Sequence, residues 1–522
     1  MSAWAPLAEP VFRALWLASL GSNIGTWMQN VGAAWLMTSL TPSPLYVALV
    51  QTATYLPVLL IGLPAGAIAD IIDRRKVLLV TQGWMTLAAG LLSLCTWLGW
   101  TGPNLLLLFT FILGAGATVN APAWQAILPE LVPRAQLGPA IALNSVGFNI
   151  SRAIGPALGG LVVSFINPAA AFTLNAVSFV GVLVVIYRWK REGKGHQEKS
   201  ERVVNAVMAG LRYVRFAPEL HGVMLRSFLF VIPASALWSL LPLLAREELQ
   251  SGSSGYGLML GALGLGSVAI AAVLPRLRKS MRTDRLVSVS ILVFALVHAA
   301  LYVFTSFLTV LFILLLGGAC WITIMSSFNT VAQQVLPSWV RARALSVYIF
   351  LFQGGMALGS TVWGMVAENL SIRETLLAAS VCMAVTVPLT IRWRLETGQD
   401  QDVRPSQHWP EPTIVEPLEP ERGPVLVTTE YCIRRDCREP FLLAMRQLES
   451  IRRRDGAIRW GLFEDPANPG RYLESFLVES WAEHMRQHLR VTIADKALED
   501  AARHFHNGPE PPKITHWIAD DK

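Results

Sequence analysis

Charged and titratable side chains inside long apolar stretches are the residues of this sequence whose chemistry is most informative. Arg152, Arg226 and His298 each interrupt such a stretch. A charge near the centre of a bilayer costs about 3 kcal/mol or more, so these positions predict sites for ions, protons or substrate. Arg152, roughly 20 Å into its stretch at helical rise, could bind an anionic or oxygen-rich group through paired hydrogen bonds. His298 could exchange a proton near neutral pH.

Each of these three residues also has a structural explanation. Arg152 could hydrogen-bond helix carbonyls, and Arg226 could extend its guanidinium to the inner surface. A lone histidine on an apolar helix is commonly a packing residue. No Asp or Glu lies in the interior of the apolar stretches. The sequence therefore offers no buried carboxylate there that could carry a proton. His298 is therefore the possible proton site.

Neutral polar and aromatic residues extend the candidate site. Near the N-terminus, Asn23, Trp27 and Asn30 recur at helical spacing and share one face of the predicted helix. The predicted substrate-cavity residues are Asn23, Trp27, Asn30, Asn120, Trp124, Asn144, Asn149, Arg152 and Arg226. Interhelical hydrogen bonds without a substrate are the alternative for each of them. Together they describe a polar, aromatic, net-positive cavity that suits an amphipathic or anionic organic molecule.

Membrane-spanning helices are the elements that must position these residues. The 522 residues are 53% hydrophobic and 15% charged, which is too apolar for an ordinary soluble chain. About 20 apolar residues cross a bilayer as a helix. By that measure we predict twelve spans, at residues 11–39, 45–69, 77–99, 104–128, 138–164, 168–189, 219–245, 256–276, 285–304, 307–332, 342–366 and 374–394.

Basic residues set the predicted orientation. The connections on one side hold most of the Lys and Arg of the membrane part, whereas those on the other side hold only Arg246 and Arg373. Positive residues stay on the cytoplasmic side. We therefore expect a multi-pass membrane protein, in contact with lipid, with both chain ends in the cytoplasm.

The predicted spans divide into two halves of six. A basic cytoplasmic loop over 190–218, with an amphipathic run from Val203 to Phe216, separates residues 1–189 from residues 219–394. Sliding the chain by 208 residues places Pro10 on Pro218 and Gln125 on Gln333. This weak parallel repeat is typical of transporters built from two similar halves.

The segment GAIADIIDRRK, residues 66–76, connects the second and third predicted spans and resembles the loop signature of the major facilitator superfamily. The matching positions are Gly66, Asp70, Arg74 and Arg75. Ile71 and Asp73 stand where that signature has a basic residue and a glycine. The resemblance implies a cytoplasmic gate, with Asp70 near the positive end of the helix that begins around residues 338–341.

A second motif, GPALGG at residues 155–160, lies in the fifth predicted span. Glycine and proline there allow close helix approach and a kink. The helix-packing positions are Gly155, Pro156, Gly159 and Gly160. The motif resembles the end of the antiporter motif of the same superfamily, although Ala142 and Ser151 replace its upstream glycines. The longer phrase from Asn120 to Gly160 is similar to the bacterial exporter branch that includes the enterobactin exporter. This resemblance covers residues 1–394 and implies a twelve-helix fold and export.

The remaining chain has the composition of a linker and a soluble domain. Residues 395–422 are rich in Pro and Glu and predict an extended, solvated linker. Residues 423–522 predict the order βαββαβ of a ferredoxin-like α+β unit, with one helix over 481–505. This unit resembles antibiotic-biosynthesis-monooxygenase-like dimeric barrel modules, which implies a homodimer through residues 423–522. Trp460, His484 and His488 raise the alternative of an oxygenase.

The favoured interpretation is a secondary active transporter, an exporter of a small siderophore-like or drug-like molecule that works by alternating access. No Walker loop is present, so ATP-driven transport is not predicted. Five cysteines fit neither a disulfide framework nor a zinc site, and we expect no metal, cofactor, nucleic acid or enzymatic activity. The rival hypotheses are a transporter fused to a catalytic oxygenase and a non-transporting membrane scaffold or sensor.

Overall fold

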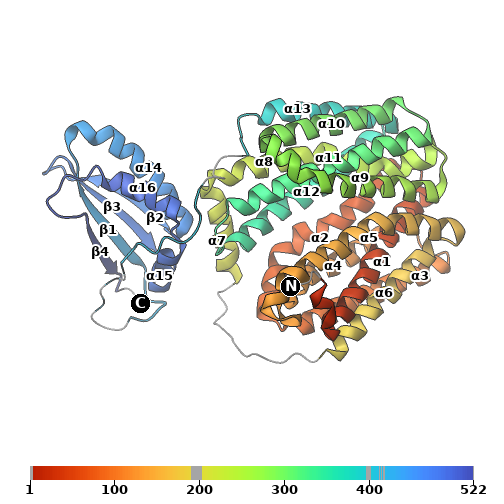
Figure 1. Ribbon diagram of the computed structural model, residues 1–522, viewed down its shortest axis with the longest axis horizontal. Helices are drawn as coiled ribbons and strands as arrows, with labels where there is room; N and C mark the ends of the chain where they lie inside the picture. Colours follow the sequence, from red (N-terminus) through yellow and green to blue (C-terminus); the bar gives the residue numbers. More distant parts are fainter. Residues whose placement is uncertain are drawn as a thin grey trace. The chain divides into compact units, whose positions relative to one another are not determined.

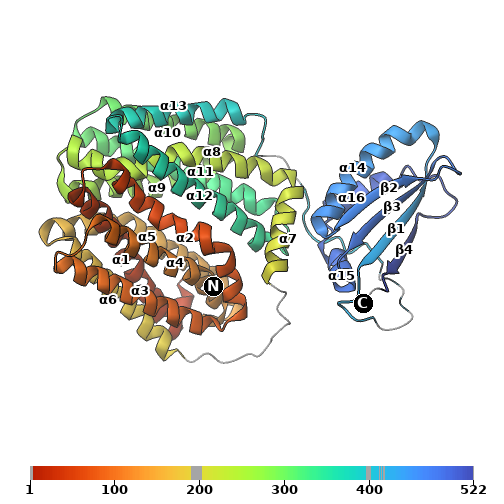
Figure 2. The same ribbon diagram turned by 180° about the vertical axis from the view of Figure 1, so that it is seen from behind.

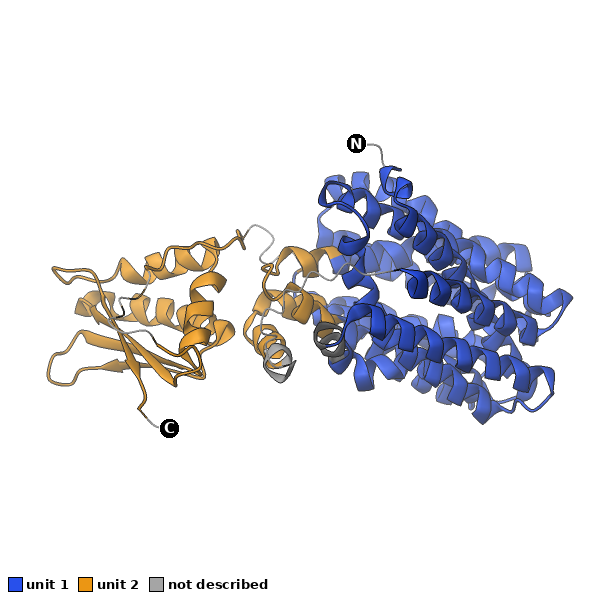
Figure 3. Ribbon diagram, turned by 90° about the horizontal axis from the view of Figure 1, so that it is seen from below, with its two compact units in different colours: residues 1–200, 224–329, 349–394 blue, residues 201–223, 330–348, 395–522 orange. Residues whose placement is uncertain are grey.

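The structure is a computed structural model that describes residues 4–189, 203–395, 401–410, 412, 414 and 418–520. Of residues 63, 66–71 and 203–207 only the backbone is described. The chain divides into two compact units, shown in different colours in Figure 3. Unit 1 comprises residues 1–200, 224–329 and 349–394, and unit 2 comprises residues 201–223, 330–348 and 395–522.

Long helices make up nearly all of the chain before the linker, and Figures 1 and 2 show them in two bundles. The first bundle contains α1 (Pro10–Leu40), α2 (Pro44–Ile71), α3 (Arg74–Trp97), α4 (Pro103–Leu131), α5 (Leu137–Phe165) and α6 (Pro168–Arg188). The second contains α8 (Pro218–Leu243), α9 (Gly252–Ser280), α10 (Thr283–Val303), α11 (Phe307–Gln334), α12 (Arg341–Ala367) and α13 (Ile372–Thr390). The twelve-helix fold expected from the sequence is confirmed.

The helix boundaries follow local sequence signals. Pro10, Pro103 and Pro168 each occupy the first turn of a helix, where the fixed φ of proline suits the helix and its missing N–H costs nothing. Among the described helices, eleven are long and apolar enough to cross a membrane, judged by length and composition. α1 is not one of the eleven, because the polar residues along it lower its mean hydropathy.

The amphipathic run predicted from Val203 to Phe216 is helix α7, Val203–Phe216. The rest of the predicted basic loop, residues 190–202, lies outside the described residues. α7 falls in unit 2 together with the first residues of α8 and the connection between α11 and α12. These segments are therefore grouped with the C-terminal residues rather than with the two bundles.

The C-terminal residues form a four-stranded antiparallel sheet covered on one face by helices. Its strands are β1 (Val425–Cys432), β2 (Arg459–Glu464), β3 (Arg471–Val478) and β4 (Lys513–Ile518), and their order is β2-β3-β1-β4. The helices are α14 (Arg438–Asp455), α15 (Trp481–Arg490) and α16 (Ile493–Arg503). Tyr431, Phe441, Met445 and Leu448 pack between sheet and helices. The predicted ferredoxin-like order is confirmed.

Two local expectations for this region are corrected by the structure. The single helix predicted over 481–505 is broken, because Thr492 and Asp495 form a capping box that starts α16. The linker predicted to be solvated is also partly ordered against the domain. The backbone N–H of Ser406 donates to the Val491 carbonyl at 2.9 Å, and Pro405 pairs with Thr492 in a β-bridge.

Candidate functional site

Helix α5 packs tightly against α1 along one face. A methyl group at Gly155 would lie 2.6 Å from the Cβ of Trp27, and one at Gly159 would lie 2.8 Å from the Cα of Met28. Real Cβ atoms do not approach that closely, so only glycine fits at these two positions. Two of the predicted helix-packing residues therefore lie in a close contact within the first bundle.

The opposite face of α5 packs against α9 of the second bundle. A methyl group at Gly160 would lie 2.6 Å from the Ser253 carbonyl oxygen, and one at Gly257 would lie 2.7 Å from the Pro156 carbonyl oxygen. Further along α9, a methyl group at Gly264 would approach the Cα of Ala153 to 3.0 Å. The GPALGG segment thus forms a glycine-lined seam through which the two halves touch.

Arg152 lies on a side of α5 between these two contacts. At 3.6 residues per turn, Gly155 faces α1 and Ala153 faces α9 on nearly opposite sides. One of the remaining sides is apolar and exposed, through Ile150, Ile154, Leu158 and Leu161. The other carries Asn149 and Arg152, and Tyr55 of α2 lies near enough to the Arg152 guanidinium for a charge on one to be felt by the other. Arg152 therefore points away from the lipid-facing side of its helix.

Polar contacts bridge the two halves at one end of the bundles. Arg246, in the π-turn after α8 (Leu244–Glu248), donates to the Thr38 hydroxyl at 3.0 Å at the end of α1. Glu368, just after α12, accepts hydrogen bonds from the Ser43 hydroxyl and, at 3.2 Å, from the backbone N–H of Leu45 at the start of α2. These contacts connect the halves where α1, α8 and α12 end.

Arg226 is held in an ion pair rather than left free in the membrane. It is 4% exposed, and its guanidinium contacts the Asp284 carboxylate at 2.5 Å and the Ser288 hydroxyl at 3.0 Å. α10 begins one residue before Asp284, so this carboxylate lies at a helix end, just outside the predicted ninth span. A buried arginine needs such a partner, and the pair joins α8 to α10.

Arg74 and Arg75 of the predicted gating motif contact neighbouring helices of the first bundle. Arg74 forms a salt bridge of 2.9 Å with Glu130 at the end of α4. Arg75 donates to the carbonyl oxygens of Ile186 and Tyr187 at 3.1 and 2.7 Å. A cation at these carbonyls offsets the negative end of α6.

The position that departs from the gating signature has a structural role. The Asp73 carboxylate accepts from the backbone N–H of Lys76 at 3.0 Å and caps the N-terminus of α3. The aspartate at this position therefore supplies the N-terminal cap of α3. The side chains of Asp70 and its neighbours at 66–71 lie outside the described residues, so the predicted gate stays a prediction.

The polar candidates on the other helices divide into packed and open positions. The Asn120 amide oxygen accepts from the Thr81 hydroxyl at 2.9 Å and from Gln82 at 3.3 Å, so it links α3 to α4. Asn149 donates to the Ser145 carbonyl of its own helix. Partly or fully exposed positions are Asn23, Trp27, Asn30, Trp124 and Asn144. These stay predicted cavity residues.

His298 is buried in the aromatic interior of the second bundle. Its Nδ1 donates to the Phe294 carbonyl at 2.9 Å, and its ring packs edge-on against the Phe294 ring. In the described part of the chain, His298 Nε2 and Trp238 Nε1 are buried without a hydrogen-bond partner. Trp238 and Tyr55 were missed by the sequence analysis. A polar aromatic side chain in an apolar run was the only signal for either.

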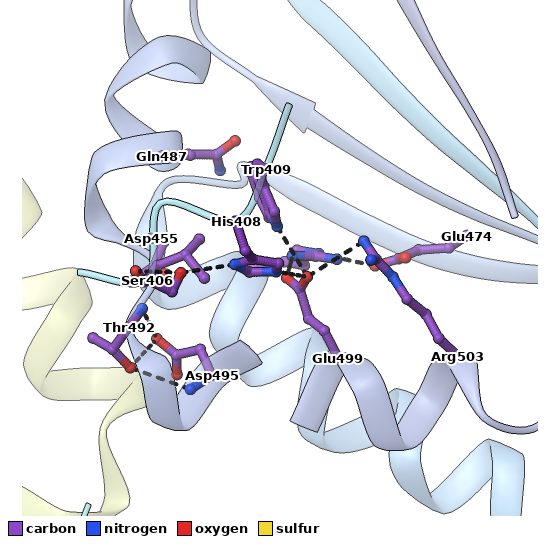
Figure 4. Close-up of polar contacts among 12 residues, drawn as sticks. Ser406, His408, Trp409, Asp455, Glu474, Gln487, Thr492, Asp495, Glu499 and Arg503 are labelled. Atoms are coloured by element: carbon purple, nitrogen blue, oxygen red, sulfur yellow. Dashed lines mark hydrogen bonds and ion pairs between the residues drawn. The ribbon is translucent and has the colours of Figure 1, made fainter. Parts of the chain in front are cut away.

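A buried charge network lies under the sheet of the C-terminal domain (Figure 4). Arg452 pairs with Glu474 at 3.1 Å and with Glu499 at 2.5 Å. Glu499 also accepts from His408 Nε2 and Trp409 Nε1, both at 2.9 Å. Burial alone would raise the pKa of Glu499, but the Arg452 charge and these hydrogen bonds lower it to about 2. His408 and Trp409 of the predicted linker thus complete the interior of the domain.

The residues that suggested an oxygenase lie near this network. Trp460 Nε1 donates to Glu474 at 3.1 Å. The Nε2 atoms of His484 and His488 are 3.4 Å apart, and burial together with the charges of His516 and His488 lowers the pKa of His484 to about 3. Within the described ranges no three His, Cys, Asp or Glu side chains are arranged to hold a metal ion.

Two six-helix bundles that meet along a glycine-lined seam, with an arginine beside it, define a membrane transporter of the major facilitator fold. The solved structure of a bacterial homologue of the human lysosomal transporter Spinster, inward-facing and occupied, matches with a TM-score of 0.61 at 14% identity. It covers 75% of this chain and 98% of its own. The D-xylose-proton symporter matches with a TM-score of 0.59 at 12% identity, covering 73% and 97%.

The chain belongs to the transmembrane secretion effector family, whose model matches residues 1–522. The staphyloferrin A transporter of Staphylococcus aureus is 24% identical over 362 residues, 67% of this chain and 88% of the relative. The multidrug efflux pump Tap of Mycobacterium tuberculosis is 25% identical, covering 73% and 93%. The enterobactin exporter EntS of Salmonella typhi is 29% identical, covering 54% and 67%. The predicted membership of the superfamily and of its exporter branch is confirmed.

Proposed function

We propose that this transporter exports a small amphipathic or anionic organic molecule, siderophore-like or drug-like, across the bacterial inner membrane by a secondary active mechanism. The relatives named for siderophore and drug export support the substrate class and the direction. The observation that carries the proposal is the position of Arg152, on a polar side of α5 between its contacts with α1 and α9. A guanidinium there, beside the seam between the halves, suits an anionic or oxygen-rich group.

Alternating access in this proposal is a rocking of the two halves about the α5–α9 seam. With the N-terminus in the cytoplasm, the ends of α1, α8 and α12 lie on the outer side. The bridges from Arg246 to Thr38 and from Glu368 to Ser43 then close the outer side. Release of substrate to the outside requires these bridges to break.

Arg152 provides the experiment. We expect Arg152→Ala to abolish transport and Arg152→Lys to lose most of it, because an ammonium cannot reproduce the paired hydrogen bonds of a guanidinium. Purified protein in proteoliposomes would be tested with staphyloferrin A, enterobactin and a cationic dye as separate probes. Substrate-induced thermal stabilisation would report binding independently of transport.

The matched control is Asn149→Ala, one helical turn away on the same side of α5, where the side chain bonds its own helix. It should leave thermal stability and membrane insertion near wild type. Equal substrate-induced stabilisation in wild type and Arg152→Lys would show that Arg152 only packs. The failure of every probe in the wild-type protein would instead count against the transport proposal itself.

We also propose that the C-terminal domain forms a homodimer through the uncovered face of its sheet. Phe463, Leu473 and Trp517 are exposed on that face, Trp517 by 61%. Arg471 and Glu430 lie beside them and pair at 2.7 Å. In a twofold dimer the same face is buried on both subunits, so the apolar side chains of one copy would cover those of the other.

Trp517→Glu should convert dimers to monomers, as measured by mass photometry of the full chain in detergent, because it would bury a carboxylate without a partner against the second copy. Leu443 on α14 is also exposed but lies on the helical side of the domain. Leu443→Glu is therefore the control and should leave the assembly unchanged. A wild-type protein that is monomeric at micromolar concentration would contradict the dimer.

A further inference from the structure

The C-terminal domain shares its compact unit with two segments that belong by sequence to the helical part of the chain. These are residues 201–223, which contain α7, and residues 330–348, which connect α11 to α12. Figure 3 shows them in the same colour as the domain. α7 packs against α14, and a methyl group at Gly210 of α7 would lie 3.0 Å from the Cβ of Arg343. α7 therefore contacts both the domain and the start of α12.

A single buried carboxylate joins α7 to the domain. Glu483 at the start of α15 is 7% exposed and accepts from Arg490 at 2.6 Å and from Arg486 at 2.7 Å within the domain. Its third partner is Arg212 of α7, at 3.1 Å. Burial would raise the pKa of Glu483, but the three arginines lower it. The carboxylate is thus ionised and shared between the domain and α7.

Two aromatic rings outside the domain lie against its arginines. The Arg454 guanidinium is 5.3 Å from the ring centre of Tyr213 in α7, and the Arg490 guanidinium is 4.5 Å from the ring centre of Trp339. The two rings also contact each other edge-on at 5.7 Å. Buried guanidinium–ring contacts are favourable because the cation lies over the negative face of the ring.

A glycine with an unusual backbone conformation lies next to the Glu483–Arg212 ion pair. Gly456, at the end of α14, has a φ of +138°, which a residue with a side chain rarely adopts. A methyl group there would lie 2.8 Å from Glu483 Oε1 and 3.5 Å from the Arg212 guanidinium. Both the conformation and the space at Gly456 therefore exclude a side chain at the contact with α7.

We propose that the C-terminal domain is a clamp that docks on α7 and on the segment around Trp339. The docking surface consists of Glu483, Arg490 and Arg454, and its partners are Arg212, Tyr213 and Trp339. By chain connectivity, α7 continues into α8 and the Trp339 segment continues into α12. The clamp therefore holds the starts of two helices of the second half to one rigid domain. That this slows the rocking of the halves rests on the proposed function; the docking itself does not.

Substitution of the two rings tests the docking and leaves the sequence of the domain intact. In the full-length protein, Tyr213→Leu and Trp339→Leu should each speed hydrogen–deuterium exchange about tenfold in peptides covering 208–216 and 336–343. Exchange in β3 should stay unchanged. Leu443→Ala, at an exposed leucine of α14 outside the sheet, is the control. Unchanged exchange in both ring variants would overturn the clamp.

Arg212→Met provides a second variant, since the Arg212 side chain is 27% exposed and methionine keeps its unbranched apolar stem while removing the charge. It should raise exchange in the same two regions, because Glu483 keeps its two other arginines while α7 loses its ion pair. In proteoliposomes, the three undocked variants should transport about fivefold faster than wild type. Faster exchange with an unaltered transport rate would overturn the restraint on rocking, whereas a wild type that moves no probe would contradict only the proposed function.

Discussion

Alanine at Gly257 should abolish most transport, whereas alanine at Gly261, one turn further along α9, should be tolerated. Both glycines face α5 across the seam that joins the two halves. A methyl group at Gly257 would lie 2.7 Å from the Pro156 carbonyl oxygen and 2.9 Å from the Cα of Gly160, which are backbone atoms that cannot turn aside. At Gly261 the nearest atom, the Cβ of Ala157, is 3.8 Å away. Only the first substitution must push the halves apart.

Overpacking of a close contact costs about 1–3 kcal/mol, so Gly257→Ala should also lower the thermal midpoint of the purified protein in detergent. Gly261→Ala is the matched control, because it adds the same methyl group to the same helix face. Transport in proteoliposomes and thermal unfolding would be measured for both. Equal behaviour of the two variants would show that the seam opens without cost and is not the contact about which the halves move.

Much of the helical fold could be predicted because its signals are local. A run of about 20 apolar residues identifies a span without knowledge of its neighbours, and prolines at helix starts fix several boundaries within a few residues. The glycines of GPALGG also predicted a close contact. They could not predict which helix each glycine contacts: Gly155 packs on α1 and Gly160 on α9.

Long-range pairing is what the sequence could not supply. Arg226 seemed an isolated charge because its partner Asp284, 58 positions away, precedes the predicted start of the ninth span by one residue. A carboxylate at a helix end gives no local sign that it pairs with an arginine on another helix. Tyr55 was missed for the same reason, since only folding brings it near Arg152.

The prediction that residues 395–422 are solvated was wrong at His408 and Trp409, because the average composition of a segment does not reveal the contacts of single residues. Pro and Glu dominate residues 395–422, and that average predicts a segment without regular structure. His408 and Trp409 are nevertheless specific, because they donate to a carboxylate inside the domain. An indole within an otherwise solvated stretch was the available signal, since an exposed tryptophan in a flexible linker has no partner for its large apolar surface.

Glu499→Gln should destabilise the C-terminal domain and remove the part of its acid sensitivity that comes from this carboxylate. The folded-state pKa of Glu499, about 2, lies below the ordinary 4.5. The carboxylate therefore stabilises the fold fully above pH 4.5, and this contribution is lost as the pH falls through that value toward 2. The difference corresponds to about 3 kcal/mol. Glutamine keeps the shape but leaves Arg452 with Glu474 as its remaining carboxylate partner in the network.

Hydrogen–deuterium exchange of the full-length protein at neutral pH would measure the first effect. A loss of about 3 kcal/mol corresponds to about 100-fold faster exchange, expected in α14 and β1, which enclose the network. Glu439→Gln, an exposed glutamate on α14, is the control and should change neither. In acid titrations of thermal stability between pH 5 and pH 3, the wild-type domain should lose stability steeply and the Glu499→Gln domain much less. If wild type and Glu499→Gln lost stability equally over this pH range, an ionised Glu499 would not be what holds His408 and Trp409 against the domain.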